Sequence, residues 1–236
     1  MNPLSSLRKC CSTLAQIIRL PVAPLRFNAT LEPATVPTVY AQFTKRHPRY
    51  KLIRSKTLGA ALIDVGALDT RKKYLDGIKG KNNGAYHAAR ARKRGYVCKE
   101  IDRNAYVDDI HDINMSEDSR QGRPMDKAYT EKRERFDVLG NFRYYGVLNP
   151  AGRLVAYATF GMYGNFGAFS QLMGHRNNDG IMHLLIVDVV CRQIDEGELQ
   201  YIMYDTYFGA QPGLRQFKTI LGFKPYRAKY SLQSPP

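Results

Sequence analysis

The sequence predicts an α/β protein in which a mixed, largely antiparallel central sheet is flanked by helices. The main observation is the order of patterns in the last third of the chain, which reads strand, loop, helix, strand, helix, strand. A strand, helix, strand unit buries its helix against a sheet, so this order requires sheet on one side of the helix. Apolar runs and turn residues place the five regular elements at 168–175, 181–197, 199–208, 209–223 and 224–232.

Glycine and proline mark the ends of these elements. The long apolar run 181–197 stops at Gly197, as a helix often does. Residues 199–208 are rich in aromatic and β-branched side chains, which is typical of a strand. In the next segment Pro212 stands early in a helix and Gly222 at its end. The apolar residues between them have helical spacing: Leu214, Phe217 and Leu221.

Upstream elements are predicted from shorter patterns. Residues 57–68 fit a strand followed by a glycine turn, although part of the run also suits a helix. Two helices are expected over 70–80 and 85–95, and a β-hairpin over 141–164. Asp108, Asp109 and Asp112 lie close together but lack the glycine and closing glutamate of a calcium loop, which favours a solvated helix face.

The N-terminal region differs from the rest in composition. Residues 1–31 contain no acid, and their apolar residues fall on one side of a possible helix, either a mitochondrial presequence or a helix packed on the domain. Residues 21–38 contain four prolines and are predicted to be an extended linker. We therefore expect residues 1–39 to be a basic helix and linker, and residues 40–236 to be a single domain.

Charge and cysteine content limit the possible partners. The net charge is +15, and between residues 45 and 99 sixteen Lys or Arg stand against three Asp. Such a field attracts polyanions, including nucleic acid, acidic membrane surfaces and coenzyme A, without choosing among them. The four cysteines form no CxxC pair, which favours reduced thiols in a cytoplasmic protein and indicates no metal site. No apolar run reaches membrane-spanning length.

The second strand of the pattern carries a carboxylate that needs an explanation. Alternation along 199–208 predicts one face with Asp205 and Tyr207 and the other with Tyr204. An aspartate in an apolar strand is costly to bury unless it is paired. Asp205 is therefore either a general base or amine anchor, with Tyr204 or Tyr207 as proton donor, or a structural partner of Arg215 or Lys218.

The order of elements, together with Gly213, Leu214, Phe217 and Lys218 in the helix before the final strand, resembles the GNAT acyltransferase fold. More narrowly it resembles the FemAB-like branch, and the resemblance extends upstream to about Thr70. It implies an acyl-CoA co-substrate whose pyrophosphate sits at the start of the helix 181–197. The residues implied for cofactor binding are Arg176, Asn177, Asn178, Gly180 and Lys218. Asp179 and Ile181 depart from the family pattern, which has glycine and a small residue there.

Further candidate residues complete the predicted site. His175 precedes the cofactor loop and is a second candidate base, whereas His183 lies inside the helix and is expected to be a core histidine. The loop containing Arg120, Gln121 and Arg123, with Arg215, is suited to a carboxylate or phosphate of the substrate.

The function predicted from these features is N-acyl transfer from an acyl-CoA or another thioester to an amine acceptor. One alternative is a FemAB-like aminoacyl transferase that uses aminoacyl-tRNA, bound by the basic segment 45–99. The other is a catalytically silent GNAT-fold protein that binds nucleic acid through the same segment. No Walker-type loop, serine nucleophile elbow or HExxH motif points to another enzyme class.

Overall fold

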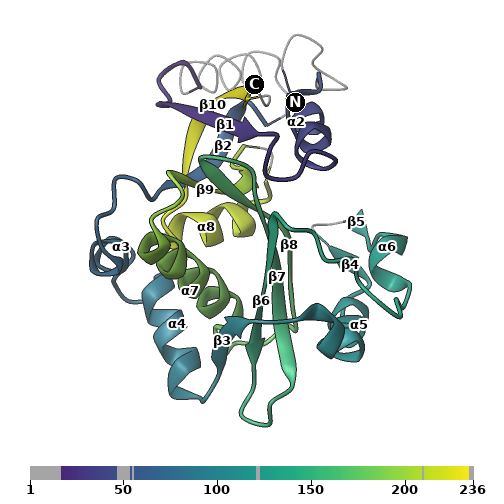
Figure 1. The fold of residues 1–236 in the computed structure, drawn as a ribbon. Helices are drawn as coiled ribbons and strands as arrows, with labels where there is room; N and C mark the ends of the chain where they lie inside the picture. Colours follow the sequence, from purple (N-terminus) through teal and green to yellow (C-terminus); the bar gives the residue numbers. More distant parts are fainter. Residues whose placement is uncertain (1–16, 47–53, 55, 121–122, 209, 234–236) are drawn as a thin grey trace, which may run out of the picture.

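The computed structural model describes residues 17–46, 54, 56–120, 123–208 and 210–233. Here an eight-stranded sheet runs in the order β1-β10-β2-β9-β8-β7-β6-β3, and helices lie on its two faces (Figure 1). Only β1 with β10 and β8 with β9 pair in parallel, so the sheet is mixed and largely antiparallel, as predicted.

The strands of the main sheet are β1 (Val22–Asn28), β2 (Leu58–Asp64), β3 (Val97–Glu100), β6 (Phe142–Leu148), β7 (Leu154–Met162), β8 (Phe166–Gly174), β9 (Tyr201–Thr206) and β10 (Lys224–Gln233). A small hairpin consists of β4 (Ser119–Arg120) and β5 (Arg123–Pro124). The helices are α2 (Val36–Thr44), α3 (Arg71–Gly77), α4 (Gly84–Lys93), the 3-10 helix η1 (Arg103–Tyr106), α5 (Val107–Met115), α6 (Lys127–Thr130), α7 (Ile181–Glu196) and α8 (Pro212–Ile220). No helix among the described residues has the length and apolar character to cross a bilayer.

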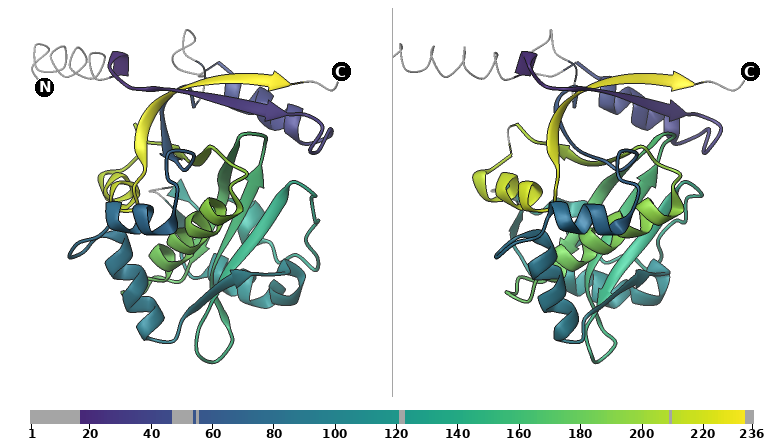
Figure 2. Two further views of the ribbon diagram at one scale, coloured as in Figure 1. Left: turned by 60° about the vertical axis from the view of Figure 1, so that its left-hand side comes forward. Right: turned by 90° about the vertical axis from the view of Figure 1, so that its left-hand side faces the viewer.

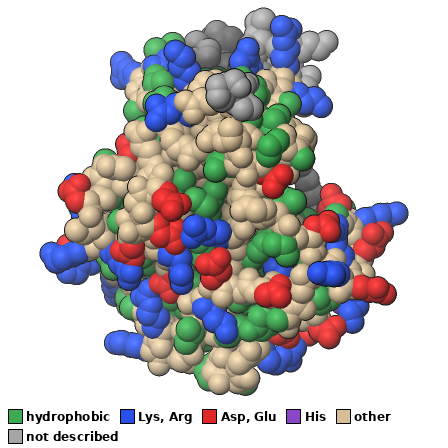
Figure 3. Space-filling view, in the orientation of Figure 1, with side chains coloured by type: hydrophobic (Ala, Val, Ile, Leu, Met, Phe, Trp, Pro, Cys, Tyr) green, Lys and Arg blue, Asp and Glu red, His purple; other side chains and the backbone are tan. Residues whose placement is uncertain are grey.

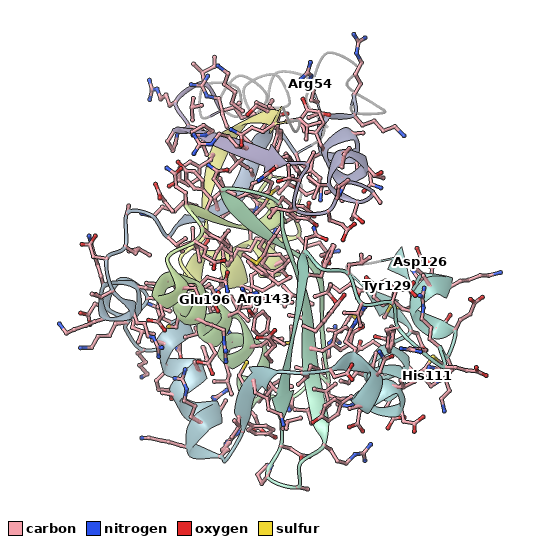
Figure 4. All side chains as sticks on the ribbon, in the orientation of Figure 1. Arg54, His111, Asp126, Tyr129, Arg143 and Glu196 are labelled. Carbon is pink, nitrogen blue, oxygen red and sulfur yellow. The ribbon has the colours of Figure 1, made fainter. Side chains whose placement is uncertain are left out.

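Helix α7 is the centre of the larger core. Residues on nearly all its sides are buried, because sheet lies on one side and α3 and α4 lie on the other: Ile181, Leu184, Leu185, Ile186, Val187, Val189, Val190 and Cys191. Its polar end is tied to the sheet by Arg143 of β6, which lies beside Glu196 with 2.8 Å between Nη1 and Oε1 (Figure 4). The apolar run 181–197 is therefore a core helix, as its pattern predicts.

Residues 57–68 contain a strand and residues 102–114 a helix, as the sequence favours. Residues 58–64 are the strand β2, because both faces of this segment are buried in the sheet. The aspartates of α5 bind cations of the protein itself: Asp109 and Asp112 both accept from the Arg153 guanidinium, and Asp108 pairs with Lys132. These carboxylates hold the β6–β7 turn and neighbouring loop against α5.

The prediction that residues 21–38 form a linker is wrong at both ends, since β1 lies in its first part and α2 begins at Val36. Val22–Asn28 is the edge strand β1, which pairs with β10 over seven residues and runs beside it across the top of the molecule (Figure 2). Alternate residues Ala23, Leu25 and Phe27 are fully buried, in a second core beneath α2. The proline within the strand is tolerated because β1 lies at the sheet edge, where fewer backbone donors are needed.

The turn between β7 and β8 holds the free edge of β1. The Asn165 side chain accepts from the Arg26 backbone N–H at 2.7 Å and donates to the Pro24 carbonyl at 2.9 Å. The backbone N–H of Asn165 also donates to the Arg26 carbonyl. The sheet therefore curls back on itself and encloses the second core, because its edge strand is bonded to a hairpin that lies beyond β9 in the strand order.

We expect Asn165→Ala to lower the free energy of unfolding by about 1–3 kcal/mol, because it leaves strand groups of β1 without partners. Urea denaturation at neutral pH measures this. The exposed Gln216→Ala on α8 is the control and should change stability by less than about 0.5 kcal/mol. Equal stability of the two variants would show that the side chain of Asn165 does not hold β1.

Candidate functional site

Strands β8 and β9 pair for only three residues and then separate. The parallel register joins Phe166 to Tyr201, Gly167 to Ile202 and Ala168 to Met203, while β8 continues to Gly174. Beyond Ala168 the edge of β8 that faces β9 has no strand partner in the described sheet. The pairing of the two central strands therefore ends at Ala168 and Met203.

Two cavities lie along this separation. The first, here called the aromatic cavity, has a volume of about 310 Å³ and is lined by Val39, Gln42, Phe43, Lys56, Phe142, Tyr163, Ala168, Phe169, Ser170, Leu172, Tyr204 and Asp205. The second, the loop cavity, has a volume of about 330 Å³ and is lined by His87, Arg90, Gly174, His175, Arg176, Asn177, Asn178, Gly180, Ile181, Met182, His183 and Phe217. Residues of β8 line both, so the strand connects them.

Both strands bulge at the aromatic cavity. In β9, Tyr204 and Asp205 together stand opposite Ala61 of β2, because the register shifts by one residue between Met203 and Thr206. In β8, Ser170 is the extra residue opposite β7. A bulge turns a side chain away from its regular direction. Tyr204 and Asp205 therefore line one cavity, and the predicted alternation along 199–208 fails at this point.

Asp205 forms an ion pair with Lys56 at the rim of the aromatic cavity. The Oδ1–Nζ distance is 3.2 Å, and 55% of the Asp205 side chain and 34% of the Lys56 side chain remain exposed. Asp205 is thus paired, as the structural alternative expects, but its ion-pair partner is Lys56 and not Arg215 or Lys218. Both residues have a left-handed backbone, with φ of 51° at Asp205 and 55° at Lys56. Such conformations cost on the order of 1 kcal/mol each and are frequent at functional sites.

Lys218 lies beneath this pair and not in the loop cavity. Its side chain is 1% exposed, its Nζ donates to the Thr206 carbonyl at 2.7 Å, and it lies 4.6 Å from the centre of the Tyr204 ring. Burial lowers the pKa of Lys218 to about 8, partly offset by Asp205. The Lys218 ammonium therefore supports the end of β9 and the Tyr204 ring from inside the protein.

The loop 176–180 leads into the first turn of α7 at the loop cavity. Gly180 is the N-cap with φ of 89°, and a Cβ there would lie 2.4 Å from the His87 carbonyl oxygen, so only glycine fits. The first N–H groups of a helix have no intrahelical partner and carry the positive end of its dipole. Asn177, Asn178 and Gly180 therefore surround a helix start suited to an anion.

Asp179 turns away from this helix start. Its carboxylate pairs with Arg94 and accepts from the Tyr96 hydroxyl at 2.7 Å. Asp179 does not cap the helix, because Gly180 is the N-cap. Its negative charge is neutralised by Arg94 and so opposes a bound anion less than its position in the sequence suggests.

Helix α4 holds the loop and α7 through its arginines. Arg90 donates to the Asn178 carbonyl, Arg92 pairs with Asp188 and Arg94 pairs with Asp179. The basic segment 45–99 is therefore not a uniform cationic surface, because these three arginines, and Arg71 with Asp195, are engaged by the protein itself. The exposed Lys79, Lys81 and Lys93 remain available in this region.

The histidines of the loop cavity are stacked. The rings of His87 and His183 lie 4.4 Å apart, and Phe217 packs edge-on against His183 at 4.8 Å. Burial, with the neighbouring His87 and Arg90, lowers the pKa of His183 to about 4. His183 is thus half-buried at the cavity wall. His175, the second candidate base, also lines this cavity and lies in a different cavity from Asp205.

The other predicted residues lie around these cavities. The Tyr207 hydroxyl is 2.7 Å from the Thr219 hydroxyl of α8, and Arg215 is an exposed residue of α8; neither residue lines the two cavities. Arg120 and Arg123 are opposite each other in the backbone register of the β4–β5 hairpin, whereas Gln121 lies outside the described residues. Glu117, just before this hairpin, pairs with Arg176 at 3.2 Å, which brings the hairpin's start close to the loop 176–180.

A wider cavity, of about 690 Å³, lies outside this region, between α3, α4 and the outer side of α7. Four of its charges form two ion pairs, Arg71 with Asp195 and Arg92 with Asp188, and Glu196 pairs with Arg143. Burial raises the pKa of its two free thiols, to about 12 for Cys98 and about 11 for Cys191. Over the described ranges, no three His, Cys, Asp or Glu side chains are grouped as metal ligands.

No protein-family model matches the sequence, and no curated protein matches it. Among solved structures, FemX is similar with a TM-score of 0.55 and 10% identity, over 71% of this chain and 59% of FemX. L-PGS from Bacillus licheniformis has a TM-score of 0.47 and 15% identity, over 71% of this chain and 57% of L-PGS. A tandem GNAT protein from the clavulanic acid biosynthesis pathway has a TM-score of 0.43 and 18% identity, over 71% of this chain and 50% of that protein. The chain thus spans between half and three fifths of these proteins. The likeness to FemX shows that the chain has a GNAT-like fold, as the sequence predicts.

We expect the stacked histidines to make stability fall in acid. Because the folded pKa of His183 lies below its ordinary 6.5, protonation favours the unfolded chain: stability is full above pH 6.5 and decreases as pH falls toward 4. The loss at pH 5 is about 2 kcal/mol. Urea denaturation at pH 7 and pH 5 measures it, with His183→Gln as the comparison. A pH dependence that persists unchanged in His183→Gln would assign the effect to other groups.

Proposed function

We propose that this protein is an N-acyltransferase that moves an acyl group from an acyl-CoA, or another thioester, to an amine. The observation that carries the proposal is the separation of β8 and β9, with a helix start at one end and a carboxylate at the other. A thioester donor has a phosphate end, an amide-bearing arm and a reactive sulfur. The loop cavity, the strand β8 that lines both cavities, and the aromatic cavity offer a matching environment for each.

The chemistry assigned to the aromatic cavity is proton removal and acceptor orientation. Asp205 binds the incoming ammonium and accepts one proton from it. Because the carboxylate is exposed, it then releases this proton to solvent water. The amine nitrogen then attacks the thioester carbonyl carbon, the C–N bond forms as the C–S bond breaks, and the second proton goes to the leaving sulfur. Tyr204 lines the same cavity and is our candidate for the group that donates a proton to the sulfur. The Tyr204 hydroxyl then regains a proton from the amine nitrogen.

Donor binding is tested at the first turn of α7. Acetyl-CoA at a hundredfold excess over its Kd should raise the stability of the protein by about 2.7 kcal/mol. His183→Glu places a carboxylate at the helix start, which the helix dipole tolerates but a phosphate does not. We expect it to weaken acetyl-CoA binding by at least about tenfold, or about 1.4 kcal/mol. Calorimetric titration measures the affinity.

The matched control is His183→Gln, which changes the same side chain without adding charge. It should bind acetyl-CoA much more tightly than His183→Glu does. Equal acetyl-CoA affinity in the two variants would show that the phosphate does not bind at the start of α7. An absence of acetyl-CoA binding by the unaltered protein would rule out acyl-CoA as the donor.

A second candidate is transfer from aminoacyl-tRNA, which the cations beside the aromatic cavity favour. Lys45 and Arg46 follow α2, and an isolated bridge pairs Arg46 with Arg54, which stands at the top of the molecule (Figure 4). All three are exposed and form no ion pair with another described residue. Lys and Arg side chains surround this upper part of the visible face (Figure 3). A nucleic acid bound to these cations would lie close to Lys56, which lines the aromatic cavity.

We expect the triple variant Lys45→Gln, Arg46→Gln, Arg54→Gln to weaken binding of tRNA and to reduce its salt slope by about 0.7 for each phosphate that the protein no longer neutralises. Filter binding over a salt series measures both. The matched control is the triple variant Lys79→Gln, Lys81→Gln, Lys93→Gln, which removes three positive charges from the far side of the cavity. Equally weakened binding in the two triple variants would mean that RNA binds by general charge and not at the aromatic cavity.

A further inference from the structure

The aromatic cavity combines an apolar interior with one ion pair at its rim. Five of the twelve residues that line it are aromatic: Phe43, Phe142, Tyr163, Phe169 and Tyr204. The polar residues that line it are Gln42, Lys56, Ser170 and Asp205. A cavity of this kind holds a small molecule whose body is apolar and whose polar group remains at the entrance. Its volume of about 310 Å³ is at the small end of ligand sites, which run from roughly 300 to 1,000 Å³.

The ion pair itself selects among amines. An amine that binds Asp205 alone brings a second cation next to Lys56, whose Nζ is 3.2 Å from the same carboxylate. Like charges at such short range repel, which disfavours a ligand with a single positive charge. A ligand that carries a carboxylate beside its ammonium removes this repulsion, because the carboxylate faces Lys56. The rim is therefore complementary to a zwitterion.

Both members of the pair are held in place by the fold. Lys56 lies with its Nζ 4.4 Å from the centre of the Phe43 ring, and Asp205 is aimed by the β9 bulge. Three described non-glycine residues have positive φ, and two of them are Lys56 and Asp205. An ordinary surface ion pair needs no unusual backbone at either end, so the strain at both indicates a site that fixes two opposite charges in one orientation.

We propose that the acceptor is an α-amino acid with an apolar or aromatic side chain, its ammonium on Asp205, its carboxylate on Lys56 and its side chain in the aromatic cavity. This rests on the proposed function for the reaction that follows. Acylation converts the ammonium to a neutral amide, so the product is an anion. It keeps its attraction to Lys56 but loses that to Asp205, which favours its release.

Calorimetric titration of the full chain tests the proposal with three ligands of one shape. L-Phenylalanine carries both charges, phenethylamine only the ammonium and 3-phenylpropanoate only the carboxylate. We expect L-phenylalanine to bind at least about tenfold more tightly than either, which is about 1.4 kcal/mol. L-Serine, with the same charges and no apolar body, should bind at least about tenfold more weakly than L-phenylalanine.

Variants then assign each charge. Lys56→Gln should abolish the preference for L-phenylalanine over phenethylamine, and Asp205→Asn the preference over 3-phenylpropanoate. Asparagine tolerates positive φ, and melting temperatures establish that both variants fold. Lys229→Gln, an exposed change of equal charge on β10, should leave both preferences intact.

Phenethylamine binding as tightly as L-phenylalanine to the unaltered protein would overturn the proposal, as would an unchanged preference in Lys56→Gln. Acetyl-CoA binding without any amino-acid binding would also overturn it, while the proposed acyl transfer would stand. Amino-acid binding without acetyl-CoA binding would keep the acceptor and discard the acyl-CoA donor.

Discussion

The separation of β8 from β9 is the constraint on which the rest of this structure depends. Two parallel strands in the middle of a sheet normally continue side by side, because each supplies the other's hydrogen bonds. Here the pairing stops after Ala168 and Met203. Helix α7 packs against β8, and the buried Lys218 of α8 donates to the Thr206 carbonyl at the end of β9. Both cavities are consequences of that parting.

Charge in this protein is divided between structure and surface. The arginines of α4 lie opposite the acids of α7 and the loop 176–180, so they hold two elements together and contribute little to any external field. The cations around α2 and the 46–54 bridge have no such partners among the described residues. A net charge of +15 is therefore a poor guide to where a polyanion binds, since position relative to the acids decides which cations remain free.

Several parts of the fold and site were predictable because their signals are local. The helix from Ile181 to Glu196 follows from a continuous apolar run ended by Gly197, and α8 from Pro212 and the spacing of its apolar residues. The β6–β7 hairpin follows from alternation around a polar turn. The strand β1 was missed because the prolines in and around it resemble those of a linker, and what makes it a strand is pairing with β10, at the opposite end of the chain.

The sequence by itself determined the order of helices and strands from about residue 168 onward, the helix start near Gly180 and the presence of an aspartate that needs a partner. Only the tertiary structure decided which partner it has. Lys56 and Asp205 meet because β2 and β9 are neighbours in the sheet, and Tyr204 joins Asp205 in one cavity because a single extra residue shifts the register. Side-chain patterns follow from local geometry, whereas a bulge arises from the register of two distant strands, and the sequence of either strand alone does not contain it.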